Sequence, residues 1–287
     1  MSGFTLSSFV IVFRETLEAA LIVAIVLTYL IQTKANQYLR HVLWSTLAAI
    51  GTSLIVAFIF DQTVGEFEGR AAEIFEGVVA LVAAGVLTYM VLWMHKQAAK
   101  IKTQMHEKLQ LVINRQEVLS LMALPYFAVL REGAETILFL KAAALQAGGV
   151  TSAFGGIAGF ISAVFITTSF FWLGKKIPLK PFFRYTGLFL TFIAAGLLAY
   201  GLHELEEAGF IFPIIEHIWD FNPVLNEKEG IGSFLKAIFG YNGNPSLVET
   251  AAYFGYLILM MGLMFLDGKA ASQGKPAAAS PVFAKNA

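Results

Sequence analysis

Seven predominantly apolar stretches, each of about 20 residues or more, dominate this chain of 287 residues. A helix of that length crosses the hydrocarbon core of a bilayer, which is about 30 Å thick. Backbone N–H and C=O groups find no water in lipid, so a spanning segment pairs them internally. The sequence therefore predicts an all-α integral membrane protein with seven transmembrane helices, at residues 4–31, 42–60, 71–94, 118–145, 151–173, 183–203 and 248–266.

The composition of the chain agrees with a location in membrane lipid. Hydrophobic residues make up 57% of it and charged residues only 14%, whereas soluble domains carry about 25% charged residues. The formal net charge is zero and no Lys/Arg-rich block with interleaved aromatics occurs, so we expect no nucleic-acid partner. Cysteine is absent, which excludes disulfides and thiolate metal sites. The first residues carry no positive charge, so we expect no cleavable signal peptide.

Charges in the connections between these stretches alternate along the chain. The first, third and fifth connections and the C-terminal tail are basic, whereas the second, fourth and sixth connections are acidic or uncharged. By the positive-inside rule, basic connections face the cytoplasm. The sequence therefore predicts an N-terminus outside, a cytoplasmic C-terminus, an acidic outer loop at residues 204–247 and a disordered tail at residues 267–287.

Two of the predicted spans contain the same charged motif. The first span holds Arg-Glu-Thr-Leu-Glu at residues 14–18, and the fourth holds Arg-Glu-Gly-Ala-Glu at residues 131–135. The predicted topology makes these two spans antiparallel. We therefore expect an inverted repeat of spans 1–3 (residues 4–94) and spans 4–6 (residues 118–203), with the seventh span added, and a substrate site near the midplane where the repeats meet.

The spacing of the motif places its charges on one face of each helix. Residues three apart lie about 60° apart around an α-helix, and residues four apart are neighbours. An ionised side chain in the middle of a span costs roughly 2.5–3.5 kcal/mol, so such residues are expected to face the bundle interior and to mark a site. Four glutamates are predicted to converge as hard oxygen ligands of a cation, with two arginines holding them ionised when the site is empty. These residues are Glu15, Glu18, Glu132 and Glu135, with Arg14 and Arg131.

Other interpretations of the motif stay open at this point. It could be an intrahelical salt bridge that only fixes packing, although buried pairs are weak stabilisers. By chemistry alone the cation is manganese, magnesium, calcium or iron. A proton-coupled carrier of an organic solute would use the glutamates as proton relays. A membrane di-iron enzyme would need Glu-x-x-His pairs, which are missing, and a haem protein would need histidines within the spans, whereas all five lie at span ends or in loops.

Acidic residues also occur at the outer ends of the third and sixth spans. The third span begins with Glu73 and Glu76, and the sixth ends with His203, Glu204, Glu206 and Glu207. Acidic residues are common at a helix N-terminus because of the helix dipole, and charged residues are common at a solvated helix end. The functional interpretation is an acidic funnel that raises the local cation concentration, with Glu76 as the deeper ligand candidate.

These features together resemble the oxidase-dependent iron transporter family, which comprises fungal high-affinity iron permeases and bacterial EfeU-type ferrous iron permeases. The resemblance is carried by the paired Arg-Glu-x-x-Glu motifs, Phe-Glu-Gly at 75–77, Glu-Ala-Gly at 207–209 and Ile-Phe-Gly-Tyr-Asn at 238–242. It extends from Phe9 to about Leu266 and is strongest with the bacterial branch. Three positions depart from the family pattern: Thr16 replaces a glycine, Ala134 a leucine and Glu206 a histidine.

The resemblance implies a high-affinity iron permease and not an enzyme, in the cytoplasmic (inner) membrane of a bacterium. It implies that the glutamates of both motifs are needed for passage, and that Glu73 and Glu76 match the family's acidic pair in the third span. Iron is then a transported substrate and not a permanently bound cofactor. Extracytoplasmic proteins that oxidise or deliver iron are the implied partners. The oxidation state of the iron that crosses stays open.

Overall fold

The structure, a computed structural model, describes residues 3–64, 68–97, 118–147, 153–173 and 179–273. Within these ranges the chain is helical and contains no β-strand, so the predicted all-α class is confirmed. The seven long helices are α1 (Gly3–Gln32), α2 (Leu39–Val64), α3 (Arg70–Gln97), α5 (Val118–Gln146), α6 (Ala153–Trp172), α7 (Leu179–Glu207) and α9 (Leu247–Gln273). A 3-10 turn (Asn36–Tyr38) precedes α2, and a short helix, α8 (Gly230–Phe239), lies between α7 and α9.

Each predicted span corresponds to one of the long helices. Five of them, α2, α3, α6, α7 and α9, contain a stretch long and apolar enough to cross a membrane, which makes this an integral membrane protein. The other two, α1 and α5, are the helices that carry the charged motifs. Helix α9 continues to Gln273, so the beginning of the predicted disordered tail is helical. Residues 274–287 of that tail lie outside the described ranges.

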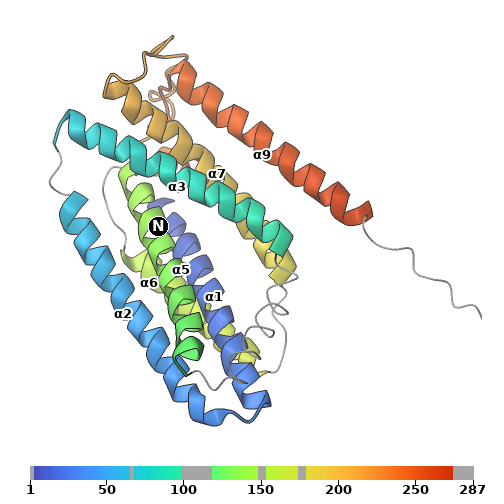
Figure 1. Cartoon of the computed structure of the whole chain (residues 1–287). Helices are drawn as coiled ribbons and strands as arrows, with labels where there is room; N and C mark the ends of the chain where they lie inside the picture. The colour runs from blue at the N-terminus through green and yellow to red at the C-terminus, as the bar shows by residue number, and fades with distance from the viewer. Residues whose placement is uncertain (1–2, 65–67, 98–117, 148–152, 174–178, 274–287) are drawn as a thin grey trace, which may run out of the picture.

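Two antiparallel helix pairs form the centre of the molecule (Figure 1). Helices α1 and α5 lie side by side and run in opposite directions, and so do α3 and α7. Helix α6 packs along α1, α2 packs along α5, and α9 packs along α7. The motif-bearing helices therefore lie between α2 and α6, where charged side chains in the middle of a span can face other helices instead of lipid.

Glycines allow the closest helix crossings. A Cβ atom at Gly159 of α6 would collide with the backbone of Phe9 and Phe13 in α1. Gly77 of α3 faces Gly201 of α7, and a Cβ atom on either residue would lie 3.0 or 2.9 Å from the carbonyl oxygen of the other. Small residues let transmembrane helices approach closely and gain van der Waals contact, so these glycines fix how near the helices lie.

The largest buried cluster joins α1, α3, α5 and α7. It contains side chains that are fully buried, among them Ile11, Leu87 and Phe139. The outward faces carry large apolar side chains that are exposed, such as Leu54 and Phe58 of α2. A broad apolar exterior is costly in water, so these faces are suited to contact with lipid.

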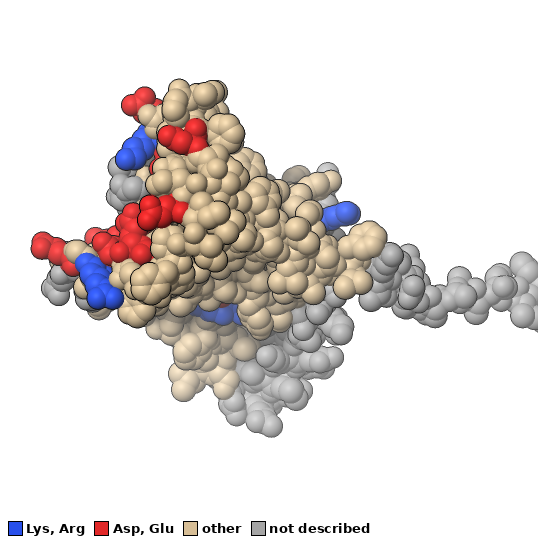
Figure 2. Space-filling view, turned by 90° about the horizontal axis from the view of Figure 1, so that it is seen from above, with Lys and Arg blue, Asp and Glu red and all other residues tan. Residues whose placement is uncertain are grey.

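The connection from α7 to α9, residues 208–246, is folded, and we call it the α7–α9 segment. Backbone hydrogen bonds connect its parts; for example, the Phe221 N–H donates to Gly243 O at 2.8 Å. It also contacts α1, because Ser7 Oγ donates to Ala237 O of α8 at 2.7 Å. Figure 2 shows Asp and Glu gathered at one side of the molecule, while most of the visible surface carries neither acidic nor basic side chains.

Candidate cation site between α1 and α5

The two copies of the motif meet where α1 crosses α5. Glu15, Glu132 and Glu135 offer carboxylate oxygens that all lie within 4.8 Å of one another. Glu15 and Glu132 are almost fully buried, with exposed fractions of 1% and 2%, and Glu135 is partly buried. The structure thus brings three of the four predicted glutamates together, although they come from segments more than a hundred residues apart.

The fourth glutamate, Glu18, is engaged by the arginine of its own helix. Glu18 Oε1 lies 2.8 Å from Arg14 Nη2, as an ion pair and not as an aligned hydrogen bond. Arg14 Nη1 also donates to Glu15 Oε1 at 3.2 Å and to Met90 Sδ of α3 at 3.2 Å. The guanidinium of Arg14 is therefore enclosed by two carboxylates and a thioether, and its side chain is only 2% exposed.

Arg131 has more open surroundings than Arg14. Its side chain is 53% exposed. Its Nε donates to Glu132 Oε1 at 3.1 Å and lies 3.5 Å from Glu135 Oε1. The guanidinium carbon also lies 5.9 Å from the centre of the Trp93 ring of α3, within the range of a cation–π contact.

Three carboxylate oxygens in this cluster are buried and have no hydrogen-bond partner. They are Glu15 Oε2, Glu132 Oε2 and Glu135 Oε2. Buried polar atoms almost always have a partner, and leaving one unpaired costs free energy. A cation among the three glutamates would satisfy these oxygens, and an all-carboxylate donor set suits a hard cation.

A second polar region lies at the end of the molecule where α7 ends and α9 begins. A cavity of about 850 Å³ lies there, and we call it the α7–α9 cavity. Its lining includes Glu76 of α3, Gln146 of α5, and Tyr200 and Glu204 of α7. Tyr200 Oη donates to Glu76 Oε2. The predicted meeting of Glu76 with the end of the sixth span therefore occurs, and a phenol lies beside it.

The other predicted residues of the outer region do not all line this cavity. His203 does, whereas Glu73, Glu206 and Glu207 are not among its lining residues. His203 Nε2 instead lies 3.3 Å from Glu207 Oε1, one turn along α7. Of the residues predicted to form the acidic funnel, only Glu76, His203 and Glu204 therefore line the α7–α9 cavity.

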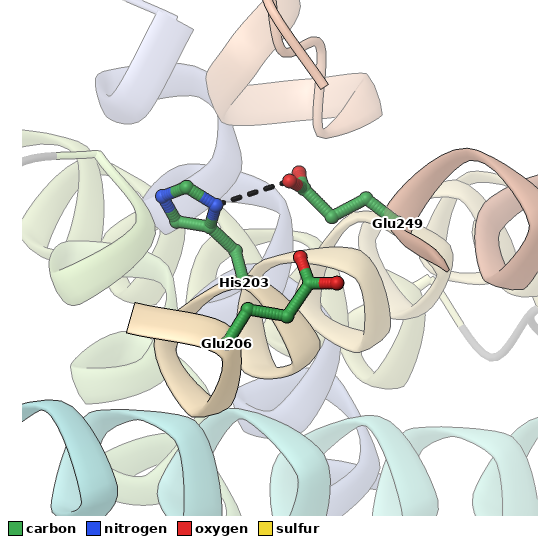
Figure 3. Close-up of side chains that lie close together, drawn as sticks. All are labelled: His203, Glu206 and Glu249. Carbon is green, nitrogen blue, oxygen red and sulfur yellow. Dashed lines mark hydrogen bonds and ion pairs between the residues drawn. The ribbon is translucent and has the colours of Figure 1, made fainter. Parts of the chain in front are cut away.

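Figure 3 shows a cluster in which His203 and Glu206 of α7 point toward Glu249 of α9. Their ligand atoms lie within 4.8 Å of one another, a spacing that could hold a metal ion. His203 Nδ1, however, is already hydrogen-bonded to Glu249 Oε1 at 3.0 Å, and Asn242 Nδ2 donates to Glu249 Oε2 at 2.8 Å. Both oxygens of Glu249 therefore already accept hydrogen bonds, unlike the unpaired oxygens of the cluster between α1 and α5.

Glu249, in the first turn of α9, is not among the site residues that the sequence predicts. The Ser246 N–H donates to Glu249 Oε1 at 3.1 Å, and the Glu249 N–H donates to Ser246 Oγ at 3.2 Å. This reciprocal pair is a capping box, which satisfies free backbone donors at a helix N-terminus. The Ser-x-x-Glu spacing at residues 246–249 is a signal that could have identified it. Met90, Trp93 and Tyr200 have no comparable signal, because their importance depends on contacts between helices.

Comparison with known proteins connects this geometry to a family. The iron permease FTR1 family matches residues 5–270. The ferrous iron permease EfeU of Yersinia pseudotuberculosis serotype I (strain IP32953) is 36% identical over 280 residues, which cover 97% of this chain and 98% of the relative. The ferrous iron permease EfeU of Escherichia coli O6:H1 (strain CFT073) is 36% identical over 252 residues, covering 87% and 91%. No solved structure matches the chain. This chain therefore belongs to the iron permease FTR1 family, and its relatives place it in the bacterial branch.

Proposed function

We propose that this iron permease carries ferrous iron through the carboxylate cluster between α1 and α5. Family membership makes the chain a transporter of iron and not an enzyme. One observation carries the location of the path: Glu15, Glu132 and Glu135 offer carboxylate oxygens within 4.8 Å of one another, and each of them also has a buried oxygen without a hydrogen-bond partner. Iron is then a passing substrate of these residues.

The formal charge of the cluster supports a cation as the substrate, and the names of the relatives support the ferrous ion. Four glutamates outnumber two arginines, so with all six ionised the empty site carries a charge of minus two. Net charge in a buried membrane site is costly, so binding of a cation there is favoured. The bacterial relatives are named ferrous iron permeases.

The proposed architecture is seven spans with an inverted repeat, an outer N-terminus and a cytoplasmic C-terminus. Its repeats are α1–α3 and α5–α7, so that α1 matches α5, α2 matches α6 and α3 matches α7. Under this exchange the α1–α6 packing becomes the α5–α2 packing, while the α1–α5 and α3–α7 pairs each map onto themselves. All four of these pairs are in contact, which supports the repeat.

The proposed path begins outside the cytoplasmic membrane, at the α7–α9 cavity. Glu76 and Glu204 attract the ion there, and a protein that oxidises or delivers iron would approach the acidic side seen in Figure 2. The ion then moves to the cluster between α1 and α5, and from there to the cytoplasm. Basic connections between the spans support this orientation.

Iron uptake by proteoliposomes that contain the purified chain tests this function. Ferrous and ferric ions are supplied separately, and Glu132→Gln is compared with the wild type and with Glu216→Gln, which changes an exposed glutamate of the α7–α9 segment. We expect saturable ferrous uptake by the wild type and by Glu216→Gln, and loss of uptake in Glu132→Gln. Uptake at the wild-type rate by correctly inserted Glu132→Gln would refute the carboxylate path. Manganese is supplied in a further assay, and transport of manganese but not iron would point to another hard cation.

A further inference from the structure

The two copies of the motif have the same sequence pattern but different surroundings. In the first copy, Arg14 is buried against Glu15, Glu18 and Met90. In the second copy, Arg131 is half exposed and lies over the Trp93 ring. In a symmetric site the two arginines would have the same burial and the same contacts. The difference between them therefore bears on which groups move when a cation binds.

We propose that the two copies have different tasks in cation binding. Glu18 is the permanent counter-ion of Arg14 and is not a ligand, whereas Arg131 is the counter-ion that leaves when the cation binds. The ligands are Glu15, Glu132 and Glu135. This division of tasks rests on the proposed function and specifies which groups of the same site carry it out.

The positions of the carboxylate oxygens separate Glu18 from the other three glutamates. Glu15, Glu132 and Glu135 have carboxylate oxygens that lie within 4.8 Å of one another, and Glu18 is not part of that group. Each of the three uses one oxygen toward an arginine and keeps the other free and buried. Glu18 turns its Oε1 toward Arg14 at 2.8 Å, closer than the 3.2 Å between Arg14 and Glu15. Binding through Glu18 would have to break that pair.

The cost of moving an arginine also differs between the copies. Removing Arg14 from its carboxylates would leave a buried charge without compensation, which typically costs several kcal/mol. Arg131 is half exposed, so its guanidinium has room to turn away from Glu132 and Glu135. The Trp93 ring offers it a cation–π contact that does not depend on either carboxylate. Displacement of Arg131 is therefore the less costly response to a cation.

Helix α3 supplies a positioning residue to each arginine. Met90 contacts Arg14 and Trp93 contacts Arg131, and the two residues are three apart, on the same side of α3. Neither side chain is a ligand of the proposed cation. In this arrangement α3 holds Arg14 in place and offers Arg131 a second contact. Binding of a cation would therefore change the contacts of α3.

Ferrous-ion binding to the purified full-length chain, measured anaerobically by titration calorimetry, tests this division with a matched pair of double variants. Arg14→Met with Glu18→Gln removes the proposed permanent pair, and Arg131→Met with Glu135→Gln makes the same chemical change in the second copy. We expect the first variant to bind within about tenfold of the wild type, and the second to bind at least about a hundredfold more weakly, differences of about 1.4 and 2.7 kcal/mol. Equal losses in both variants would overturn the division of tasks.

The wild-type chain provides a second measurement that does not depend on the folding of any variant. Phenylglyoxal modifies accessible arginines, and mass spectrometry reports the extent at each residue. Ferrous ion should increase the modification of Arg131 and leave Arg14 protected. An unchanged rate at Arg131, or a rise at Arg14, would overturn the proposal. Failure of the wild type to bind or carry iron at all would instead overturn the proposed function itself.

Discussion

Arg14 is an almost completely enclosed side chain of the candidate site. It is one of the largest fully buried side chains among the described residues, and it sits in the middle of a helix long enough to span a bilayer. A guanidinium in such a position is tolerated only because Glu15 and Glu18 neutralise it. The stability of α1 and the arrangement of its carboxylates therefore depend on one another.

Single removal of the two arginines should show this dependence. Arg14→Met leaves two buried carboxylates without their cation, and the loss of one partner from a buried pair costs about 3–5 kcal/mol. Arg131→Met should cost less, because one of the two carboxylates that it leaves, Glu135, is 19% exposed, whereas both partners of Arg14 are buried. Thermal unfolding of both variants in the same detergent measures the difference. Equal midpoints for the two variants would contradict the structure.

Glu227 gives the α7–α9 segment a dependence on pH. Its carboxylate accepts hydrogen bonds from the Gly243 N–H at 2.9 Å and from Lys236 Nζ at 3.0 Å. Burial alone would raise the pKa of the Glu227 carboxyl, but these two donors outweigh it and hold the pKa below its ordinary value. The contribution to stability is therefore present above the ordinary carboxyl pKa of about 4.3, and it is lost as pH falls through the folded-state pKa.

Limited proteolysis of the α7–α9 segment between neutral and acidic pH measures this effect. We expect the wild-type segment to become more susceptible as the pH drops below the ordinary range for a glutamate. Glu227→Gln should be more susceptible at neutral pH and should show a weaker change on acidification. A variant with the same pH profile as the wild type would assign the acid sensitivity to other groups.

At the scale of helices, glycine crossings determine how the elements fit. Gly77 and Gly201 bring α3 and α7 into backbone contact next to Tyr200 and Glu76, which are their neighbours in sequence. The hydrogen bond between Tyr200 and Glu76 spans this crossing. Any separation of α3 from α7 would therefore also disturb the lining of the α7–α9 cavity.

Gly77→Val tests this crossing, with Gly85→Val as its control on the same helix. A side chain at Gly77 would meet Gly201 and Leu205, and overpacking of this kind costs about 1–3 kcal/mol. A Cβ atom at Gly85 has nothing within 4 Å, so its replacement should be tolerated. We expect a lower unfolding temperature and weaker iron uptake for Gly77→Val alone. Similar effects from both variants would mean that the crossing is not what limits stability.

The sequence predicts the helices well because apolar length is a local signal. All seven predicted spans are found as helices, and three of the four motif glutamates, Glu15, Glu132 and Glu135, lie close together. Less could be predicted where partners come from distant segments. The contacts of Met90 and Trp93 with the arginines depend on how α3 lies against α1 and α5, and apolar patterning does not encode that placement.

Local patterning also gave little information about why the two motifs differ at their third residue. A Cβ atom at Gly133 would collide with Ser53 of α2, so the second motif needs glycine where α5 crosses α2. The first motif has Thr16 at the equivalent position, on a helix whose close crossing with α6 instead depends on Gly159. The departure from the family pattern in the first motif therefore leaves this close approach of α2 and α5 intact.

For the whole molecule, an apolar layer separates the α7–α9 cavity from the candidate cation site. Ile11 lies one turn from Arg14 on α1, and Phe139 lies one turn from Glu135 on α5, both toward the cavity. Both side chains are fully buried in the cluster that joins α1, α3, α5 and α7. The site and the cavity are therefore two separate polar regions in this structure.

Phe139→Ala tests the role of this layer. Truncation of a buried phenylalanine costs about 3–5 kcal/mol and leaves a void between the two polar regions. We expect a less stable protein whose proteoliposomes leak protons in the absence of iron, whereas Phe139→Leu should stay tight because it keeps most of the apolar volume. Leak is followed with an internal pH dye. If vesicles that contain Phe139→Ala did not leak protons, other residues would have to close the path.

The layer at Ile11 and Phe139 also bears on whether iron crosses the membrane as in a carrier or as in an open pore. Ile11 and Phe139 lie between an ion held by Glu15, Glu132 and Glu135 and the α7–α9 cavity, whose lining does not include these glutamates, so we expect each crossing to require one rearrangement of the helices. Helix rearrangements of this kind take microseconds to milliseconds. The protein would then work as a carrier with one ion per cycle, its flux levelling off at a turnover set by helix motion, and not as an open pore whose current keeps rising with iron concentration.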